Sequence, residues 1–219
     1  MKTKINWKNH FIELIVVVIG ITIAFMMENW RQEVASREIE QKYLQSFKDD
    51  LQGDANTLDS VTVSIQNKIY LLRSFIGDIK KGEVKQDKAE EVISDMLSNL
   101  SFFPKQATYE SIKNSGGMNI ISDYELKEAI VSYYSLNSEL RLKEKVFFDY
   151  LRNFVFPFVH KNLDFLAGGR IVNKSVIKSH EFRNIVAGYY TLVGQNLGMY
   201  KDYKSANEKL LKLITENDE

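Results

Sequence analysis

Residues 14–27 read LIVVVIGITIAFMM, an unbroken run of apolar or small side chains in which Thr22 carries the only hydroxyl group. Counted from Phe11, the apolar segment (residues 11–27) is 17 residues long and contains one charged side chain, Glu13. As a helix rising about 1.5 Å per residue it would cover about 25 Å, slightly less than the roughly 30 Å hydrocarbon core of a bilayer. The segment therefore predicts a transmembrane helix.

The flanks of the apolar segment indicate its orientation. Trp7 and Trp30 bracket it, and tryptophan favours the membrane–water interface. Residues 1–10 contain three lysines and no acidic residue, so the positive-inside rule predicts that they form a cytoplasmic tail. We expect an uncleaved signal anchor over residues 11–30, a single pass through the inner (cytoplasmic) membrane, and a periplasmic domain over residues 31–219.

Two other interpretations of the apolar segment compete with the anchor. A cleaved signal peptide requires a small-x-small site after the apolar run, and Phe25-Met26-Met27-Glu28 fits that pattern poorly. A buried core helix of a soluble protein would rarely lack a polar face over the 14 residues from 14 to 27. The uncleaved anchor is therefore favoured.

Two positions in the anchor bear on partners. Glu13 lies either at the cytoplasmic interface, solvated by headgroups and one helical turn from His10, or in the membrane as a proton, ion or helix-contact site. Its place near the start of the run favours the interface. Gly20 has no second glycine four residues away, so the G-x-x-x-G motif of close transmembrane helix pairs is missing.

Beyond Trp30 the pattern is helical almost throughout. Apolar residues recur every three or four positions, which places them on one helix face. The spacing predicts one helix from the membrane to about Lys80, with a break near Gly53 as the alternative because Gly-Asp also suits a turn. So long a stripe is also typical of coiled coils, and the helix could pair with a second copy. The stripe comprises Leu44, Phe47, Leu51, Ala55, Leu58, Val61, Ile65, Ile69, Leu72, Ile76 and Ile79.

Further helices are predicted in the middle of the chain. A loop over residues 80–86 precedes a shorter helix over 87–100, which ends before Phe102-Phe103-Pro104 because the residue preceding proline disfavours helix. Ser122-Asp123-Tyr124-Glu125 has capping-box spacing and opens a second long helix. Pro157 should kink or end that helix.

The C-terminal part completes the predicted fold. Gly168-Gly169 marks a firm stop, and residues 170–178 have a strand-like composition but no partner, so they predict no sheet. Ser179 is expected to cap a third long helix. Because each apolar stripe must be buried against another helix, we expect an all-α fold: an N-terminal transmembrane helix continuing into a long helix, packed in an elongated helical bundle.

Residues 108–117 form a candidate interaction corner. Thr108 is expected to cap a short helix over 109–114 that begins with Tyr109, and Gly116 and Gly117 are expected to end it. Binding residues occur more often on loops than on the helices and strands that support them, which makes this corner the best local candidate for recognition of a partner. The competing interpretation, which we favour, is a structural turn that reverses the chain.

Composition and motifs argue against several classes of function. The 29 Lys and Arg balance the 29 Asp and Glu, so no nucleic-acid partner is expected. The lack of cysteine rules out disulfides, thiolate catalysis and Cys-ligated zinc. The three histidines form no H-E-x-x-H or E-x-x-H pair, and nucleotide-binding glycine motifs and G-x-S-x-G are missing. We therefore expect no catalytic, cofactor-binding or metal-binding residue, no cofactor and no enzymatic activity.

The tyrosines are expected to be core or interface rings, with a ligand-binding aromatic cleft as the alternative.

Two stretches together resemble a known family. The first runs from Glu13 through the apolar segment to Asn29-Trp30, and the second covers residues 108–116 with Ile120-Ile121 and Glu125-Leu126. They resemble single-span membrane proteins of Bacteroidota grouped as domain of unknown function 6090. Gly116-Gly117-Met118 departs from the expected single glycine followed by a polar residue. The resemblance implies a membrane anchor continuing into a long helix, and it brings no catalytic residue.

These observations together predict a membrane-anchored scaffold or protein-interaction protein. Its partners would be the membrane lipid bilayer and either a second copy, giving a homo-oligomer, or a membrane protein. The alternative is a sensory or ion-coupled accessory subunit of a membrane complex that uses Glu13. An enzyme is the least supported class, because no nucleophile–base pair or metal cluster can be assembled from the sequence.

Overall fold

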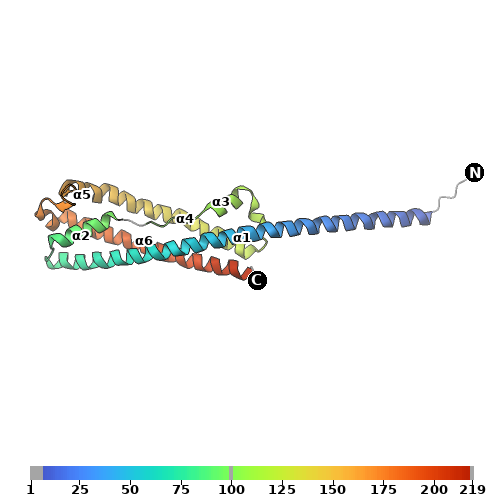
Figure 1. Cartoon of the computed structure of the whole chain (residues 1–219), viewed down its shortest axis with the longest axis horizontal. Helices are drawn as coiled ribbons and strands as arrows, with labels where there is room; N and C mark the ends of the chain where they lie inside the picture. The colour runs from blue at the N-terminus through green and yellow to red at the C-terminus, as the bar shows by residue number, and fades with distance from the viewer. Residues whose placement is uncertain (1–6, 99–100, 218–219) are drawn as a thin grey trace, which may run out of the picture.

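The computed structural model of the chain describes residues 7–98 and 101–217, with side chains from residue 11 onward. An elongated all-α bundle is joined to one long projecting helix (Figure 1), which confirms the predicted fold class. The helices are α1 (Trp7–Lys81), α2 (Gln86–Leu97), α3 (Ala107–Asn114), α4 (Tyr124–Tyr150), α5 (Phe156–Asn162) and α6 (His180–Asn217). Shorter elements are the 3₁₀ turns Gly117–Ile120 and Lys174–Lys178, the π-helical segment Leu151–Val155, and the strands β1 (Leu163–Asp164) and β2 (Arg170–Ile171).

Helix α1 continues through Gly53 for 75 residues without a break. The prediction of one long helix is therefore confirmed, and the alternative break at Gly53 is wrong. A glycine inside a helix is unfavourable by about 1 kcal/mol relative to alanine. Burial of the flanking Leu51 and Leu58 outweighs that penalty, since a fully buried leucine contributes about 1.5–3 kcal/mol.

The bundle core lies between α1, α4 and α6, because α6 packs against both of the other long helices. The apolar stripe of α1 is buried or partly buried from Leu44 onward, so its partners are helices of the same chain. Aromatic rings join the elements. Phe75 of α1 meets Phe182 of α6 edge to face at 6.0 Å between ring centroids, and Phe102 meets Tyr203 at 5.2 Å.

The return from α1 to α4 runs along the side of the bundle (Figure 1). Helix α2 ends at Leu97, where the N–H of Ser98 donates to the carbonyl of Asp95, and the predicted end at Leu100 lies outside the described residues. The predicted capping box is displaced by one residue. Asp123 caps α4 by accepting the Leu126 N–H at 2.8 Å, whereas the Ser122 N–H donates to Glu40 of α1 at 2.6 Å.

Pro157 changes the helix type without ending the helical run. Residues Leu151–Val155, which precede α5, are π-helical, and the Phe156 N–H donates to the carbonyl of Leu151, five residues back. The wider turn places Pro157 in the first turn of α5, the part of a helix in which proline is tolerated. The run therefore continues to Asn162.

The strand-like segment after Gly168-Gly169 does have a partner, so the prediction of an unpaired segment is wrong. Leu163 pairs with Ile171 and Asp164 with Arg170 in an antiparallel hairpin. Both glycines adopt positive φ, +75° and +77°, which allows the chain to reverse within a short loop. Ser179 caps α6 as predicted, with its hydroxyl oxygen accepting the Phe182 N–H at 3.1 Å.

Candidate functional site

The apolar segment lies wholly in the projecting part of α1. Within the described residues, α1 alone contains a segment long and apolar enough to span a membrane. Glu13, Gly20 and Trp30 are all exposed along it, and a Cβ atom at Gly20 would meet nothing within 4 Å. Trp7 begins α1, but its side chain lies outside the described ones. These features support a single-pass membrane protein.

The predicted interaction corner packs onto the bundle. Thr108 lies inside α3 and does not cap it, since Gln106 precedes the helix and Thr108 donates its hydroxyl to the Asp50 carboxylate of α1 at 2.6 Å. Tyr109 stacks on Tyr134 of α4 with ring centroids 4.3 Å apart and an interplanar angle of 8°. The acidic acceptor on α1 holds the threonine in the helix, which explains why its prediction as a cap was wrong.

Of the two glycines expected to end α3, Gly116 does so, whereas Gly117 begins the 3₁₀ turn Gly117–Ile120. Gly116 ends α3 at φ +69°, and its N–H donates to the carbonyl of Lys113 at 3.2 Å. Gly117 is buried, and an added Cβ would lie 3.2 Å from the Ile112 side chain. Since both sides of the corner are fixed to α1 and α4, its geometry supports the structural-turn interpretation.

A buried carboxylate that the sequence did not single out lies at the centre of the bundle. Asp54 of α1 is 2% exposed and accepts the N–H of Lys105 at 3.1 Å and the hydroxyl of Tyr133 at 3.1 Å. The Asn207 amide of α6 donates to the Tyr133 oxygen at 3.1 Å and to the Leu51 carbonyl at 3.0 Å. This Asp54 network thus ties together α1, α4, α6 and the segment preceding α3.

The pKa of Asp54 is raised to about 6, and burial is the largest influence on it. Hydrogen bonds from the Lys105 N–H and Tyr133 lower the pKa of Asp54, the nearby Asp50 charge raises it and the Lys105 charge lowers it. A carboxyl group with this pKa changes charge close to neutral pH. The network also contains a buried acceptor with no hydrogen-bond partner in the described structure, Oδ1 of Asn207.

A second buried carboxylate lies farther from the anchor. Glu144 of α4 accepts the hydroxyl hydrogen bond of Tyr200 at 2.7 Å. Burial is the largest influence and raises the pKa of Glu144, while the bond from Tyr200 lowers it. The Phe102 N–H donates to the Tyr200 oxygen at 3.4 Å. The segment between α2 and α3 is therefore bonded to the core by this network as well as by Asp54.

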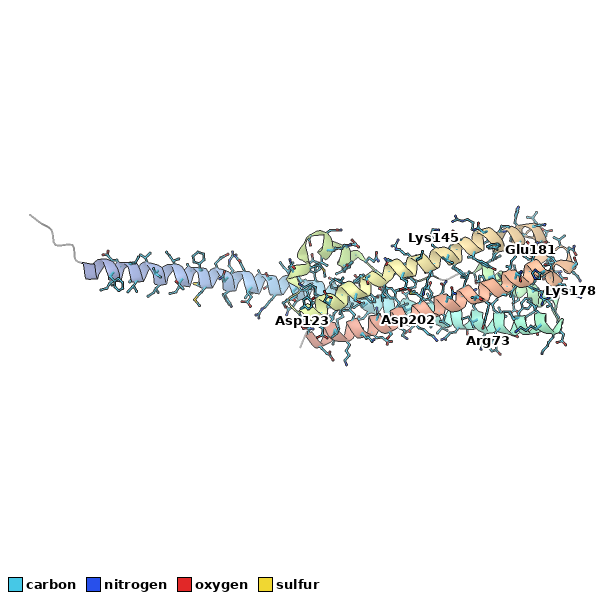
Figure 2. The ribbon with its side chains drawn as sticks, turned by 180° about the vertical axis from the view of Figure 1, so that it is seen from behind. Arg73, Asp123, Lys145, Lys178, Glu181 and Asp202 are labelled. Atoms are coloured by element: carbon cyan, nitrogen blue, oxygen red, sulfur yellow. The ribbon has the colours of Figure 1, made fainter. Side chains whose placement is uncertain are left out.

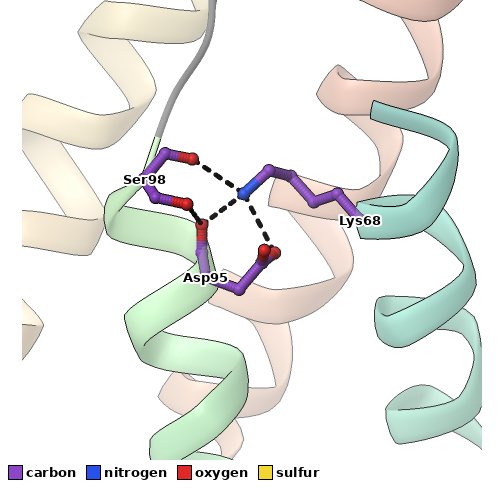
Figure 3. A network of polar contacts seen from close by, with 3 residues as sticks. All are labelled: Lys68, Asp95 and Ser98. Carbon is purple, nitrogen blue, oxygen red and sulfur yellow. Dashed lines mark hydrogen bonds and ion pairs between the residues drawn. The ribbon is translucent and has the colours of Figure 1, made fainter. Parts of the chain in front are cut away.

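A buried lysine forms the third network (Figure 3). Lys68 of α1 is 6% exposed, and its ammonium group donates to the Asp95 carboxylate at 2.9 Å and the Ser98 carbonyl at 2.8 Å. It also donates to the Asp95 carbonyl and lies 5.9 Å from the ring centroid of Tyr189. These carbonyls end α2, where the negative end of the helix dipole favours a cation. Lys68 thereby attaches α2 to α1.

These polar positions share a sequence signal. Each follows or precedes an apolar core residue by three or four positions on its helix, as Lys68 does between Ile65 and Leu72. The remaining examples are Asp54, Glu144, Asn196 and Asn207.

Across the described residues, no group of three or more His, Cys, Asp or Glu side chains is placed to hold a metal ion. The arrangement is suited to holding helices together and to responding to protons.

Comparison with known proteins places the chain in a family. No curated protein and no solved structure matches it. A family of unknown function, DUF6090, matches residues 13–192, which is more than half of the chain. The match includes residues 13–27 of the apolar segment and the corner, which belong to the two stretches that carry the resemblance seen in the sequence. The chain therefore belongs to this family of unknown function, DUF6090.

Proposed function

We propose that this chain is a membrane-anchored interaction protein. Residues 11–30 cross the inner membrane once, with the N-terminus in the cytoplasm and the helical bundle in the periplasm. The observation that carries the proposal is the continuity of α1, which passes from the exposed apolar segment into the bundle core without a break (Figure 1). Residues 31–43, the stalk, add about 20 Å of helix between membrane and bundle.

The chemistry of the core supports association instead of catalysis. Asp54, Glu144 and Lys68 are buried and bonded to backbone groups or hydroxyls of other elements, so they hold the bundle together instead of facing a substrate. The stripe of α1 is covered by the chain's own helices, which removes it as a coiled-coil seam. Association with a second copy or with another membrane protein would therefore use the span, the stalk or the outer surface of the bundle.

Cysteine labelling tests the topology, since the natural chain has no cysteine. The exposed positions Ser36 and Ser205 and the tail position Thr3 are changed singly to cysteine. In spheroplasts, a membrane-impermeant maleimide should label Ser36→Cys and Ser205→Cys, and should label Thr3→Cys only after the membrane is permeabilised. Labelling of Thr3→Cys alone, or a mature chain beginning after Met27, contradicts the proposal.

A second candidate function is a sensory or ion-coupled accessory subunit. It is favoured by the exposed position of Glu13 on the apolar segment, because a carboxylate at membrane depth is unfavourable unless it has a role. Under the interaction proposal, Glu13→Gln should leave membrane insertion and the set of proteins co-purified in mild detergent unchanged at pH 6 and pH 8. Loss of partners with Glu13→Gln, but not with the stalk control Glu33→Gln, would favour the ion-coupled subunit.

A further inference from the structure

The end of the bundle opposite the stalk carries an exposed apolar loop within a basic surface, and we propose that this end docks on an anionic phospholipid bilayer other than the one that holds the anchor. We call residues 161–178 the distal tip. The inference rests on the proposed function, because the anchor must hold the other end of the molecule. It goes further by naming the chemistry of one partner.

The loop at the distal tip presents two large apolar side chains to solvent. Phe165 is 58% exposed and Leu166 is fully exposed. The Asp164 carboxylate accepts the backbone N–H of Leu166 at 2.9 Å and that of Ala167 at 3.2 Å, which fixes the first half of the loop. The loop is thus ordered by its own hydrogen bonds and not by burial of its apolar side chains.

The hairpin below the loop is fastened to the bundle. Leu163 and Ile171 are buried beneath it. The Ile171 N–H donates to the Glu90 carboxylate of α2 at 2.9 Å, and the Val172 N–H donates to the Asn162 carbonyl at 3.0 Å. Figure 1 shows the hairpin, in orange, at the end of the bundle away from the N-terminus. Phe165 and Leu166 therefore stand on a firmly supported projection.

The charge around the loop complements an anionic surface. Residues 152–183 contain six Lys or Arg and two Asp or Glu, in a chain whose net charge is zero. The exposed cations of the tip are Lys161, Arg170, Lys174 and Lys178. Two acids offset part of this charge: Asp164, which accepts N–H groups within the loop, and Glu90, which accepts the Ile171 N–H and interacts with the charges of Arg170 and Lys174. Glu181 and Lys178 lie at the same end of the bundle (Figure 2), and counting Glu181 and Glu90 still leaves the excess positive.

This combination matches the physics of binding at a lipid interface. Apolar side chains enter the boundary between headgroups and acyl chains, and basic side chains are attracted to anionic headgroups. Helix α1 contains 51 residues from Arg31 to Lys81, which extend about 75 Å. A straight α1 therefore holds the tip far from the bilayer of its own anchor, and the docking surface must belong to another bilayer.

Vesicle capture by the full-length chain tests the proposal. The protein is reconstituted in phosphatidylcholine nanodiscs and mixed with vesicles of phosphatidylcholine and phosphatidylglycerol (70:30) or of phosphatidylcholine alone. Discs should capture the anionic vesicles in a salt-dependent manner. Leu166→Ser should weaken capture on the order of tenfold, and Lys174→Gln and Lys178→Gln about fivefold each. Leu142→Ser is the matched control, because Leu142 is 62% exposed on α4 outside the tip.

The outcomes separate this inference from the proposed function. Failure of the protein to enter nanodiscs counts against the membrane anchor itself. Successful reconstitution without vesicle capture overturns the lipid-docking proposal and points to a protein as the occupant of the tip. Equal capture of neutral and anionic vesicles, or equal losses with Leu166→Ser and Leu142→Ser, also overturns it.

Discussion

Replacing Lys68 with alanine is expected to lower the free energy of unfolding by about 3–5 kcal/mol. The Lys68 ammonium group is buried and donates to the carboxylate and carbonyl of Asp95 and to the carbonyl of Ser98. Its removal leaves these acceptors without their donor, and the Asp95 carboxylate without its cation. Urea unfolding of the detergent-solubilised chain, followed by far-UV circular dichroism, measures the change.

A surface lysine provides the control for this prediction. Lys212 pairs with Glu216 at 3.6 Å, four residues along α6, and its side chain is largely exposed. Lys212→Ala should change the free energy of unfolding by about 0–1 kcal/mol, as is usual for exposed pairs. Similar changes for Lys68→Ala and Lys212→Ala would show that the buried network does not hold the bundle.

Hydrogen exchange locates the effect of the same substitution. Because Lys68 joins the end of α2 to α1, the amides of α2 should exchange faster in Lys68→Ala, whereas those in the middle of α6 should change less. Lys68→Met keeps most of the side-chain volume and removes the charge. It therefore separates the loss of packing from the loss of the ion pair.

The path of α1 could be predicted because its evidence is local. The stripe that begins at Leu44 repeats every three or four residues, and this periodicity continues through Gly53. The apolar segment is equally local, since composition and length alone identify it. The cap at Ser179 was found for the same reason: the residue that caps α6 lies beside the helix that it caps.

The buried polar networks depend on residues far apart in the sequence. Asp54 lies next to Ala55, which the periodic pattern assigns to the stripe, and only the hydrogen bonds from Lys105 and Tyr133 show that the carboxylate faces inward. The prediction for Thr108 was wrong in the same way. Its preference for capping a helix lost to an acceptor, Asp50, that lies 58 positions earlier.

The Asp54 network predicts a stability that depends on pH. The folded-state pKa of the Asp54 carboxyl group, about 6, lies above the ordinary value of 3.8, so the folded chain binds the proton more tightly than the unfolded chain does. Protonated Asp54 makes its whole contribution to the free energy of unfolding below pH 3.8, and this contribution is lost as the pH rises to about 6. The loss is on the order of 3 kcal/mol, from about 1.4 kcal/mol per pKa unit.

The neutral, nearly isosteric substitution Asp54→Asn should abolish this dependence. At pH 4 the variant and the natural chain should have similar free energies of unfolding, because Asp54 is protonated in the folded state. At pH 7 the variant should be more stable by on the order of 3 kcal/mol, since the amide carries no charge to bury. Asp202→Asn, which alters an exposed carboxylate of α6, is the control. Parallel pH profiles for the natural chain and Asp54→Asn would mean that Asp54 keeps an ordinary pKa, and the core would then have no proton-sensitive element at this position.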